Sequence, residues 1–333
     1  MNQRNTFRRG KGAIVLALAG AMAIGITGCG GESSATPEND PHGKRVVYIP
    51  GLTGNPFYTS VSCGAAAEAK KQGIEYATQG AAEFSVPLQT QVVEAVTASH
   101  PAAIMVAVTS PKAMIAPLLQ AKRDGIKVIT IDGDLTDKSI AMTNIESDNY
   151  RGGQLAGEKM AELIGGHGDV VDLDSASGSV VAEARRAGFE DAIKKHPGIN
   201  FIGVQYTENS QSKAAQIAAT MATSNPNLKG VYAQSTNNTA GAITGLREVG
   251  KTGKVKLVGF DVSDPIIEAL HAGQIEATVL QDPIEAGRLG IDSAAAAIRG
   301  ETVPRDQKPT FAIATPQNMD TPEVKAHLYK THC

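Results

Sequence analysis

AAIMVAVTSPKAMIAPLLQAKRDGIKVITID occupies residues 102–132 and decides the fold class. Its two ends, 102–108 and 126–132, are short apolar runs without strict alternation, which is typical of strands buried on both faces. The segment between them predicts a helix over 112–123, followed by Gly125, a usual residue at a helix end. A strand, a helix and a second strand in this order predict a right-handed crossover in a parallel sheet.

The same alternation continues along the chain in both directions and falls into two sets. The expected strands are 45–51, 74–80, 102–108, 126–132, 168–174, 199–206, 228–234, 255–261 and 276–282. The expected helices are 56–72, 86–98, 112–123, 150–164, 180–195, 211–224, 239–249, 264–272 and 284–299. A polar break at 144–149 separates the sets, and the two sets predict an α/β protein with two similar doubly wound domains. One continuous barrel is the alternative α/β arrangement.

Length and charge narrow the class of protein. The 333 residues suit about two domains. With 42% apolar and 20% charged residues, the composition is that of a globular protein. The net charge is −3 and the body of the chain has no basic tract, so nucleic acid is not an expected partner.

The N-terminus has the pattern of an export signal. Arg4, Arg8, Arg9 and Lys11 precede the uncharged run 13–27, which is shorter than the roughly 20 apolar residues of a membrane-spanning helix. The sequence ITGC at 26–29 resembles the lipobox of bacterial lipoproteins, in which the cysteine is lipidated and becomes the new N-terminus. We therefore expect a signal peptide over 1–28, a lipidated Cys29 and a flexible tether over 29–43. An uncleaved membrane anchor is the alternative.

These expectations place the protein outside the cytoplasm, lipid-anchored to the cell membrane at the cell surface or in a periplasm. If Cys29 carries lipid, Cys63 and Cys333 remain as an even pair in an oxidising compartment. We predict a disulfide between them that clamps the last residues onto the first helix of the mature protein. Two unpaired thiols are the alternative.

Polar side chains gather where the expected strands end, which is where open α/β sheets bind ligands. They are Asn55, Phe57 and Tyr58 after the first strand, Asp132, Asp261, Gln281 and Asp282 at later strand ends, and Arg185 near a helix start. Carboxylates accept hydroxyl protons and a guanidinium donates to oxygens, so this set suits a polyhydroxylated ligand.

Each of these residues also has a structural interpretation. Asp132 and Asp261 could cap the following helices, Phe57 could belong to the core, and one of Arg185 and Arg186 should be a surface charge. The sequence has no HExxH or GxSxG pattern. We therefore expect no metal, no cofactor and no enzymatic activity.

Six motifs stand in order along the chain and together resemble one protein family. They are GNPFY (54–58), KVITIDGD (127–134), NIESDN (144–149), RRAGF (185–189), VGFD (258–261) and TVLQDP (278–283). In this order they resemble the ribose-binding-protein-like branch of periplasmic sugar-binding proteins, over 44–309. The resemblance implies two Rossmann-like lobes joined by three crossings, near Ser147–Asp148, Gln281–Asp282 and Pro309–Ala312. The expected N-terminal lobe is then 44–147 plus 282–309, and the C-terminal lobe 148–281 plus 310–333.

The resemblance also implies roles for individual residues. Asn55 matches an asparagine that bonds a ligand hydroxyl, and Phe57 and Tyr58 match aromatic residues that cover apolar faces of the sugar. Asp132 and Asp261 match two ligand carboxylates, and Arg185 and Gln281 match ligand-binding residues. Asn209 and Ser235 fall near two further ligand positions of the family. The chain departs from the family at Gly133, where the family often has arginine, and at Val108, where ribose binders have asparagine. Asn209 and Ser235 are departures as well, since Asn209 falls near an aromatic position of the family and Ser235 near an asparagine.

The function implied by this resemblance is capture of a small sugar or sugar alcohol by hinge closure and its delivery to an ATP-binding cassette (ABC) importer. The departures favour a pentose or a short polyol, and a monomer is expected. A receptor for a membrane sensor and a binder of a furanosyl autoinducer-type molecule stay open. A transcription regulator of this fold would need an N-terminal DNA-binding segment where the export signal stands, and an enzyme on this scaffold would need a catalytic constellation.

Overall fold

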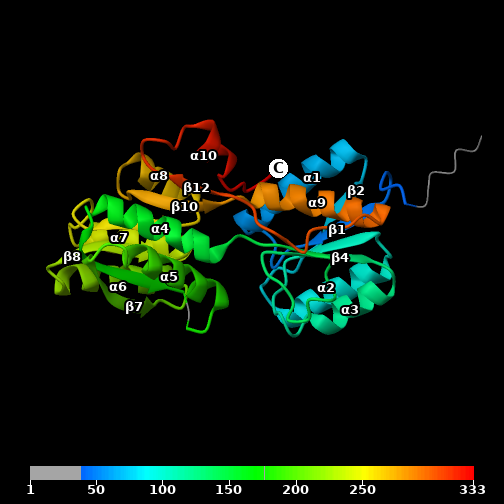
Figure 1. Ribbon diagram of the computed structural model, residues 1–333, viewed down its shortest axis with the longest axis horizontal. Helices are drawn as coiled ribbons and strands as arrows, with labels where there is room; N and C mark the ends of the chain where they lie inside the picture. Colours follow the sequence, from blue (N-terminus) through cyan, green and yellow to red (C-terminus); the bar gives the residue numbers. More distant parts are fainter. Residues whose placement is uncertain (1–38, 176) are drawn as a thin grey trace, which may run out of the picture. The chain divides into compact units, whose positions relative to one another are not determined.

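The computed structural model describes residues 39–175 and 177–333 (Figure 1). The expected signal peptide, Cys29 and the tether up to residue 38 lie outside the described residues. Within these described ranges the strands form two six-stranded sheets. We refer to each sheet with its covering helices as the N-terminal lobe and the C-terminal lobe.

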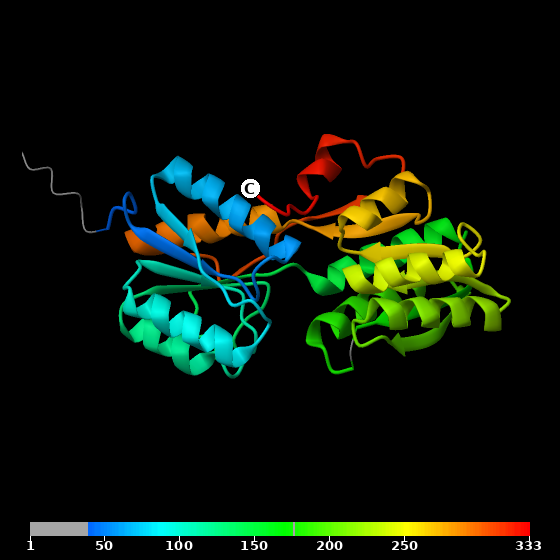
Figure 2. The same cartoon turned by 180° about the vertical axis from the view of Figure 1, so that it is seen from behind.

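The N-terminal lobe is built on a sheet with the strand order β11-β5-β4-β3-β1-β2. Its strands are β1 (Arg45–Ile49), β2 (Glu75–Thr78), β3 (Ala103–Val106), β4 (Lys127–Ile131), β5 (Thr143–Ile145) and β11 (Asp306–Gln307). Its helices are α1 (Pro56–Gln72), α2 (Val86–Ala98), α3 (Ile115–Arg123) and α9 (Pro283–Arg299). Although α1 and α9 are far apart in the sequence, they lie side by side (Figures 1 and 2).

The C-terminal lobe is built on a sheet with the strand order β12-β10-β9-β8-β6-β7. Its strands are β6 (His167–Asp174), β7 (Gly198–Tyr206), β8 (Leu228–Ala233), β9 (Lys256–Phe260), β10 (Ala277–Gln281) and β12 (Phe311–Ala314). Its helices are α4 (Asn149–Leu163), α5 (Val180–Ile193), α6 (Gln211–Ser224), α7 (Thr236–Glu248), α8 (Asp264–His271) and α10 (Pro322–Ala326).

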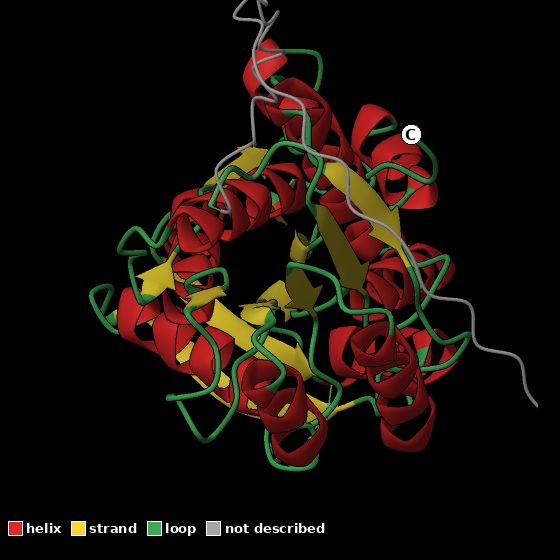
Figure 3. Cartoon of the chain, turned by 90° about the vertical axis from the view of Figure 1, so that its right-hand side faces the viewer, coloured by secondary structure: helices red, strands yellow, loops and turns green. Residues whose placement is uncertain are grey.

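Every pairing between these strands is parallel except the antiparallel pair β10–β12. Helices cover both faces of each sheet (Figure 3), which is why the strands carry apolar residues at successive positions. In β1, Val47 faces the core shared with α2 and α3, while Tyr48 faces the core shared with α1 and α9. The sequence prediction of two doubly wound α/β lobes is confirmed.

Helix α1 shows how local sequence positions the site. Asn55 caps its first turn through its side-chain oxygen, and Pro56 occupies the first helical position, where a missing N–H costs nothing. The helix ends at Gly73, whose φ of 65° is a left-handed conformation that glycine adopts readily. The cap fixes Phe57 and Tyr58 in the first turn, directly beyond the end of β1.

Helices α4 and α5 pack closely enough that only glycine fits between them. A Cβ atom on Gly153 of α4 would lie 1.8 Å from the carbonyl oxygen of Arg185, and one on Gly188 of α5 would lie 1.9 Å from that of Tyr150. This close packing holds the first turn of α4 against the Arg185 region of α5.

Between β1 and β12 the chain changes from one lobe to the other three times. The changes follow β5, β10 and β11. The third lies at 308–310, slightly before the expected position, because Phe311 already belongs to β12.

Three short strands were not predicted from the sequence. The polar break at 144–149 was expected to be a simple separator, but Thr143–Ile145 within and before it form β5. The others are β11 and β12, the second of which pairs antiparallel to β10. The tail also contains one short helix, α10.

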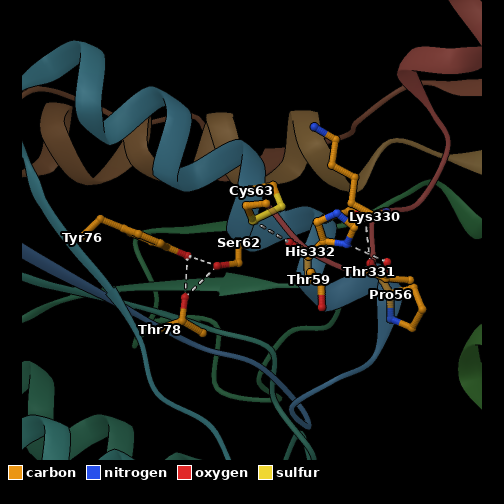
Figure 4. The surroundings of a disulfide bond; sticks show 11 residues. Pro56, Thr59, Ser62, Cys63, Tyr76, Thr78, Lys330, Thr331 and His332 are labelled. Carbon is orange, nitrogen blue, oxygen red and sulfur yellow. Dashed lines mark hydrogen bonds between the residues drawn. A yellow bond between two sulfur atoms is a disulfide. The ribbon is translucent and has the colours of Figure 1, made fainter.

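Cys63 of α1 and Cys333 at the chain end form a disulfide in the structure (Figure 4). The backbone N–H of Lys330 donates to the Ser60 hydroxyl (2.6 Å), one turn before Cys63. The end of the chain is thereby attached to α1. No helix among the described residues is long and apolar enough to cross a membrane.

Candidate functional site

A cavity of about 630 Å³ lies where strands of both lobes end. Seven of the nine ligand-site residues expected from the sequence line it: Asn55, Phe57, Tyr58, Asp132, Arg185, Asp261 and Gln281. A second cavity of about 380 Å³ shares Asn55, Phe57 and Asp261 with the first, and the remaining two residues, Asn209 and Ser235, line it. The structure therefore brings all nine residues to two adjoining cavities, and their contact with a ligand stays a prediction.

Asp132 and Asp261 occupy equivalent places in the two lobes, one residue after β4 and one after β9. Their φ angles are 58° and 67°, in the left-handed region that aspartate tolerates better than most residues. Each backbone N–H donates to a neighbouring strand, from Asp132 to the Ile145 carbonyl (2.9 Å) and from Asp261 to the Val279 carbonyl (2.8 Å). Backbone strain held in place by such bonds is common at binding sites.

The structure contradicts the interpretation of the two aspartates as helix caps. Neither Asp132 nor Asp261 caps a helix, since Asp148 is the N-cap of α4 and Ser263 that of α8. Phe57 packs against the core of the N-terminal lobe, but it also lines both cavities. The two carboxylates are therefore not accounted for by capping.

The Asp132 carboxyl group is partly withdrawn from water. Burial raises its pKa to about 7, and the negative charges of Glu146 and Asp261 act in the same direction. The positive charge of Arg185 and the hydroxyl of Tyr58, which donates to Oδ2 (3.2 Å), lower the pKa but do not cancel the effect of burial. Near neutral pH this group is therefore poised between its acid and its carboxylate form.

This raised pKa predicts a pH-dependent stability. The folded protein binds the Asp132 proton more tightly than the unfolded chain, so the free energy of unfolding falls as pH rises from about 4 to about 7. Asp132→Asn removes this pH-dependent component of the stability. Urea unfolding of the ligand-free protein should be measured at several pH values. The free energy of unfolding of the variant should rise relative to that of wild type as pH rises. A constant difference, matching the surface control Asp124→Asn, would contradict the assignment.

Asp261 is held by two donors that both bind one of its oxygens. Gln281 Nε2 donates to Oδ1 at 2.8 Å, and the hydroxyl of Tyr329 donates to the same atom at 2.5 Å. Burial, with the Asp261 charge beside it, raises the pKa of Tyr329 well above its usual value, so the phenol stays a donor at neutral pH. This arrangement orients the carboxylate and leaves Oδ2 to accept a ligand proton.

Arg185 is buried and oriented on three sides. Its Nε donates to Asn149 Oδ1 (2.9 Å), and its Nη1 donates to the Gln234 carbonyl (2.9 Å). Its guanidinium carbon lies 3.6 Å above the centroid of the Phe260 ring, a cation–π contact. The adjacent Arg186 is more exposed and pairs with Asp174. Arg185 is thus the arginine directed to the cavity, and its Nη2 remains to meet a ligand oxygen.

Asn55 and Tyr58 already use part of their hydrogen-bonding capacity within the protein. Asn55 Oδ1 accepts from the backbone N–H groups of Phe57 (2.9 Å) and Tyr58 (3.4 Å). The amide nitrogen of Asn55 is therefore the group that can donate to a ligand hydroxyl. The hydroxyl of Tyr58 is engaged with Asp132, so its ring is the part that can cover a ligand.

Asn209 and Ser235 contact each other at the edge of the second cavity. The Ser235 hydroxyl donates to Asn209 Oδ1 (2.8 Å) and also accepts from the backbone N–H of Asn238 as the N-cap of α7. Asn237 Nδ2 donates to the Asn209 carbonyl (3.0 Å). Asn209 has a φ of 53°, so its backbone adopts the left-handed conformation of a tight turn.

Two aromatic residues at the cavities were not expected from the sequence. Tyr329 lines the second cavity from the C-terminal tail, and Phe84 lines the first from the loop before α2. Phe84 follows the expected strand 74–80 just as Asn55 follows the first strand, so the same rule could have indicated it. Tyr329 lies in the tail beyond the expected strands, where the rule does not apply. Among residues 39–175 and 177–333, no group of histidine, cysteine or acidic side chains has the arrangement of a metal site.

Comparisons with known proteins agree with this geometry. The sequence profile described as "Periplasmic binding protein domain" matches residues 46–302. The ribose import binding protein RbsB of Escherichia coli is 28% identical over 78% of this chain and 86% of its own length. The D-apiose import binding protein of Actinobacillus succinogenes is 29% identical over 76% of this chain and 82% of its own length.

Solved structures show the same likeness. An ABC transporter solute-binding protein from Agrobacterium vitis, bound with α-D-tagatopyranose, is 31% identical with a TM-score of 0.79, over 86% of this chain and 99% of its own. A carbohydrate transporter solute-binding protein from Agrobacterium radiobacter, in complex with D-arabinose, is 29% identical with a TM-score of 0.76, over 86% and 99%. With two doubly wound lobes, a polar cavity between their strand ends and a profile match over most of its length, this chain belongs to the periplasmic binding protein domain family.

Proposed function

We propose that this protein captures a small sugar or sugar alcohol between its lobes and delivers it to an ABC importer. The observation that carries the proposal is the pair of equivalent aspartates, one from each lobe, at cavities that they share with Arg185, Asn55 and Gln281. Relatives named for ribose and apiose import, and structures holding tagatose and arabinose, support the same class of ligand.

The proposed mechanism is binding without chemical conversion. The N-terminal lobe supplies Asn55, Tyr58 and Asp132, and the C-terminal lobe supplies Arg185 and Asp261. A ligand that bonds to both sets favours the closed arrangement, because only closure satisfies groups from both lobes at once. We place the lobe boundaries at 44–147 plus 282–309 and 148–281 plus 310–333. The closed form then docks on the permease as a monomer.

The ligand is proposed to be a pentose or a short polyol. Gly133 and Val108 line the larger cavity and have no hydrogen-bonding side chain, so they offer no partners for an additional ring hydroxyl. Fewer polar partners favour a ligand with fewer hydroxyl groups to satisfy.

A binding screen tests both parts of this proposal. Thermal shift followed by calorimetry on the purified protein would compare D-ribose, D-arabinose, D-apiose, D-allose, D-tagatose and short polyols. We expect the tightest binding from a pentose or a short polyol. Tightest binding of a hexopyranose would contradict the size assignment, and binding of no carbohydrate would contradict sugar capture itself.

We further propose that residues 1–28 are removed and that Cys29 is lipidated, which tethers the protein to the membrane beside its permease. The basic residues, the uncharged run and the ITGC sequence support this. The same exported location is oxidising and suits the Cys63–Cys333 disulfide. Cys29→Ser should release the protein from the membrane fraction; retention of this variant there would argue for an uncleaved anchor.

A further inference from the structure

The last six residues connect the two lobes a fourth time. Leu328 and Tyr329 pack against the core of the C-terminal lobe. One residue later, the backbone of Lys330 binds Ser60 of α1, and Cys333 is joined to Cys63 of the same helix. Figure 4 shows Lys330, Thr331 and His332 lying against α1 beside the disulfide. We refer to residues 328–333 as the C-terminal strap.

His327, the residue before the strap, is held beside the second and third lobe crossings. The buried ring of His327 places Nε2 3.6 Å from Asp282 Oδ2 and 3.4 Å from the Thr310 hydroxyl. Its Nδ1 lies 2.9 Å from the carbonyl oxygen of Glu323 in α10. Tyr329 follows two residues later, so it is held between this cluster on one side and the disulfide on the other.

Tyr329 contacts a candidate ligand residue from each lobe. Its hydroxyl donates to Asp261 Oδ1 in the C-terminal lobe (2.5 Å). Its ring meets the Phe57 ring of the N-terminal lobe edge to face, with centroids 5.7 Å apart and planes at 75°. The same side chain lines the cavity that also contains Asn209 and Ser235.

We propose that Tyr329 is a positioning residue of the ligand site, which fixes the orientation of the Asp261 carboxylate and is itself held in place by the Cys63–Cys333 disulfide. This inference rests on the function proposed above. Because Tyr329 and Gln281 both bind Oδ1, the second oxygen of Asp261 is directed to the ligand. Without the disulfide, the strap loses its covalent attachment to α1, and the entropic cost of ordering Tyr329 then opposes binding.

A double-mutant cycle on the purified protein tests the positioning role. Affinities for D-ribose, D-arabinose, D-apiose, D-allose and D-tagatose would be measured by calorimetry for Tyr329→Phe, Asp261→Asn and their combination. We expect Tyr329→Phe to lower the affinity for the tightest-binding sugar about 10-fold. In the Asp261→Asn background the same substitution should lower the affinity by less than about threefold, because the two residues act through one hydrogen bond. Tyr206→Phe, in the C-terminal lobe but outside both cavities, should leave affinity unchanged.

The role of the disulfide is tested with the same sugars. The Cys63→Ser, Cys333→Ser double variant should have an affinity for the tightest-binding sugar about 3-fold to 10-fold lower than wild type. Adding Tyr329→Phe to this double variant should lower the affinity by a smaller factor than it does in wild type. Unchanged affinity of Tyr329→Phe, or equal effects of Tyr329→Phe with and without Asp261→Asn, would overturn the proposal.

A ligand-independent measurement separates this inference from the proposed function. The same cycle in urea unfolding should show coupling of Tyr329 and Asp261 by about 10-fold in the unfolding equilibrium constant. If wild type bound none of the sugars, the proposed function would be contradicted. Coupling of Tyr329 and Asp261 in the unfolding equilibrium constant would still show that Tyr329 fixes the Asp261 carboxylate. Absence of coupling would overturn the positioning role whether or not a sugar binds.

Discussion

Replacing Asp261 by asparagine is expected to weaken sugar binding by about 100-fold. A hydrogen bond to a charged group contributes about 1.5–3 kcal/mol, and about 1.4 kcal/mol corresponds to a tenfold change in affinity. The variant loses the charged oxygen that the proposed function assigns to a ligand hydroxyl. Asparagine also adopts the left-handed backbone found at this position, so the change isolates the carboxylate from backbone strain.

Calorimetry with the tightest sugar of the screen checks this expectation. Asp264→Asn is the matched control, because Asp264 is exposed three residues along the same segment and lines neither cavity. Thermal unfolding of both variants establishes that each is folded. An affinity for Asp261→Asn within about threefold of wild type would remove this carboxylate from the ligand site.

Removing the disulfide is expected to have the largest effect on stability. Cys63 and Cys333 are 270 residues apart, and cross-linking so long a loop restricts the unfolded chain strongly. The expected loss of unfolding free energy for the Cys63→Ser, Cys333→Ser double variant is on the order of 4 kcal/mol. Urea unfolding of wild type with and without reductant, beside the double variant, measures it.

The surface variant Thr331→Ala, within the C-terminal strap, is the control for the disulfide and should leave stability within about 0.5 kcal/mol of wild type. Reductant should lower the stability of wild type to that of the double variant and leave the double variant unchanged. Equal stabilities of oxidised wild type and the double variant would contradict the expectation that the bridge stabilises the protein by restricting the unfolded chain.

Most of the fold could be predicted from the sequence because buried parallel strands carry a strong local signal. IKVITID and VKLVGFD are mainly apolar segments that end in aspartate, and they contain β4 and β9. The strands that could not be predicted are short. β5 contains three residues beside a polar segment and β11 contains two, so each depends on pairing with a neighbour rather than on its own composition.

The candidate site could be predicted as far as the rule of parallel strand ends extends. Asp132, Asp261 and Gln281 directly follow or end strands, and the topology brings such positions to one cleft. Tyr329 lies in a tail without periodicity and reaches Asp261 only through the folding of α10 and the attachment to α1. Contacts of this kind depend on tertiary structure, and a single sequence carries no local signal for them.

The fixed orientation of Arg185 has a consequence for the kinetics of capture. Asn149, Gln234 and the Phe260 ring already hold this side chain, so few rotamers remain to be restricted when a ligand arrives. Preorganised groups lower the entropic cost of association. The association rate should therefore be set mainly by the rate at which the lobes close. Differences in affinity between sugars should then arise mainly from their dissociation rates.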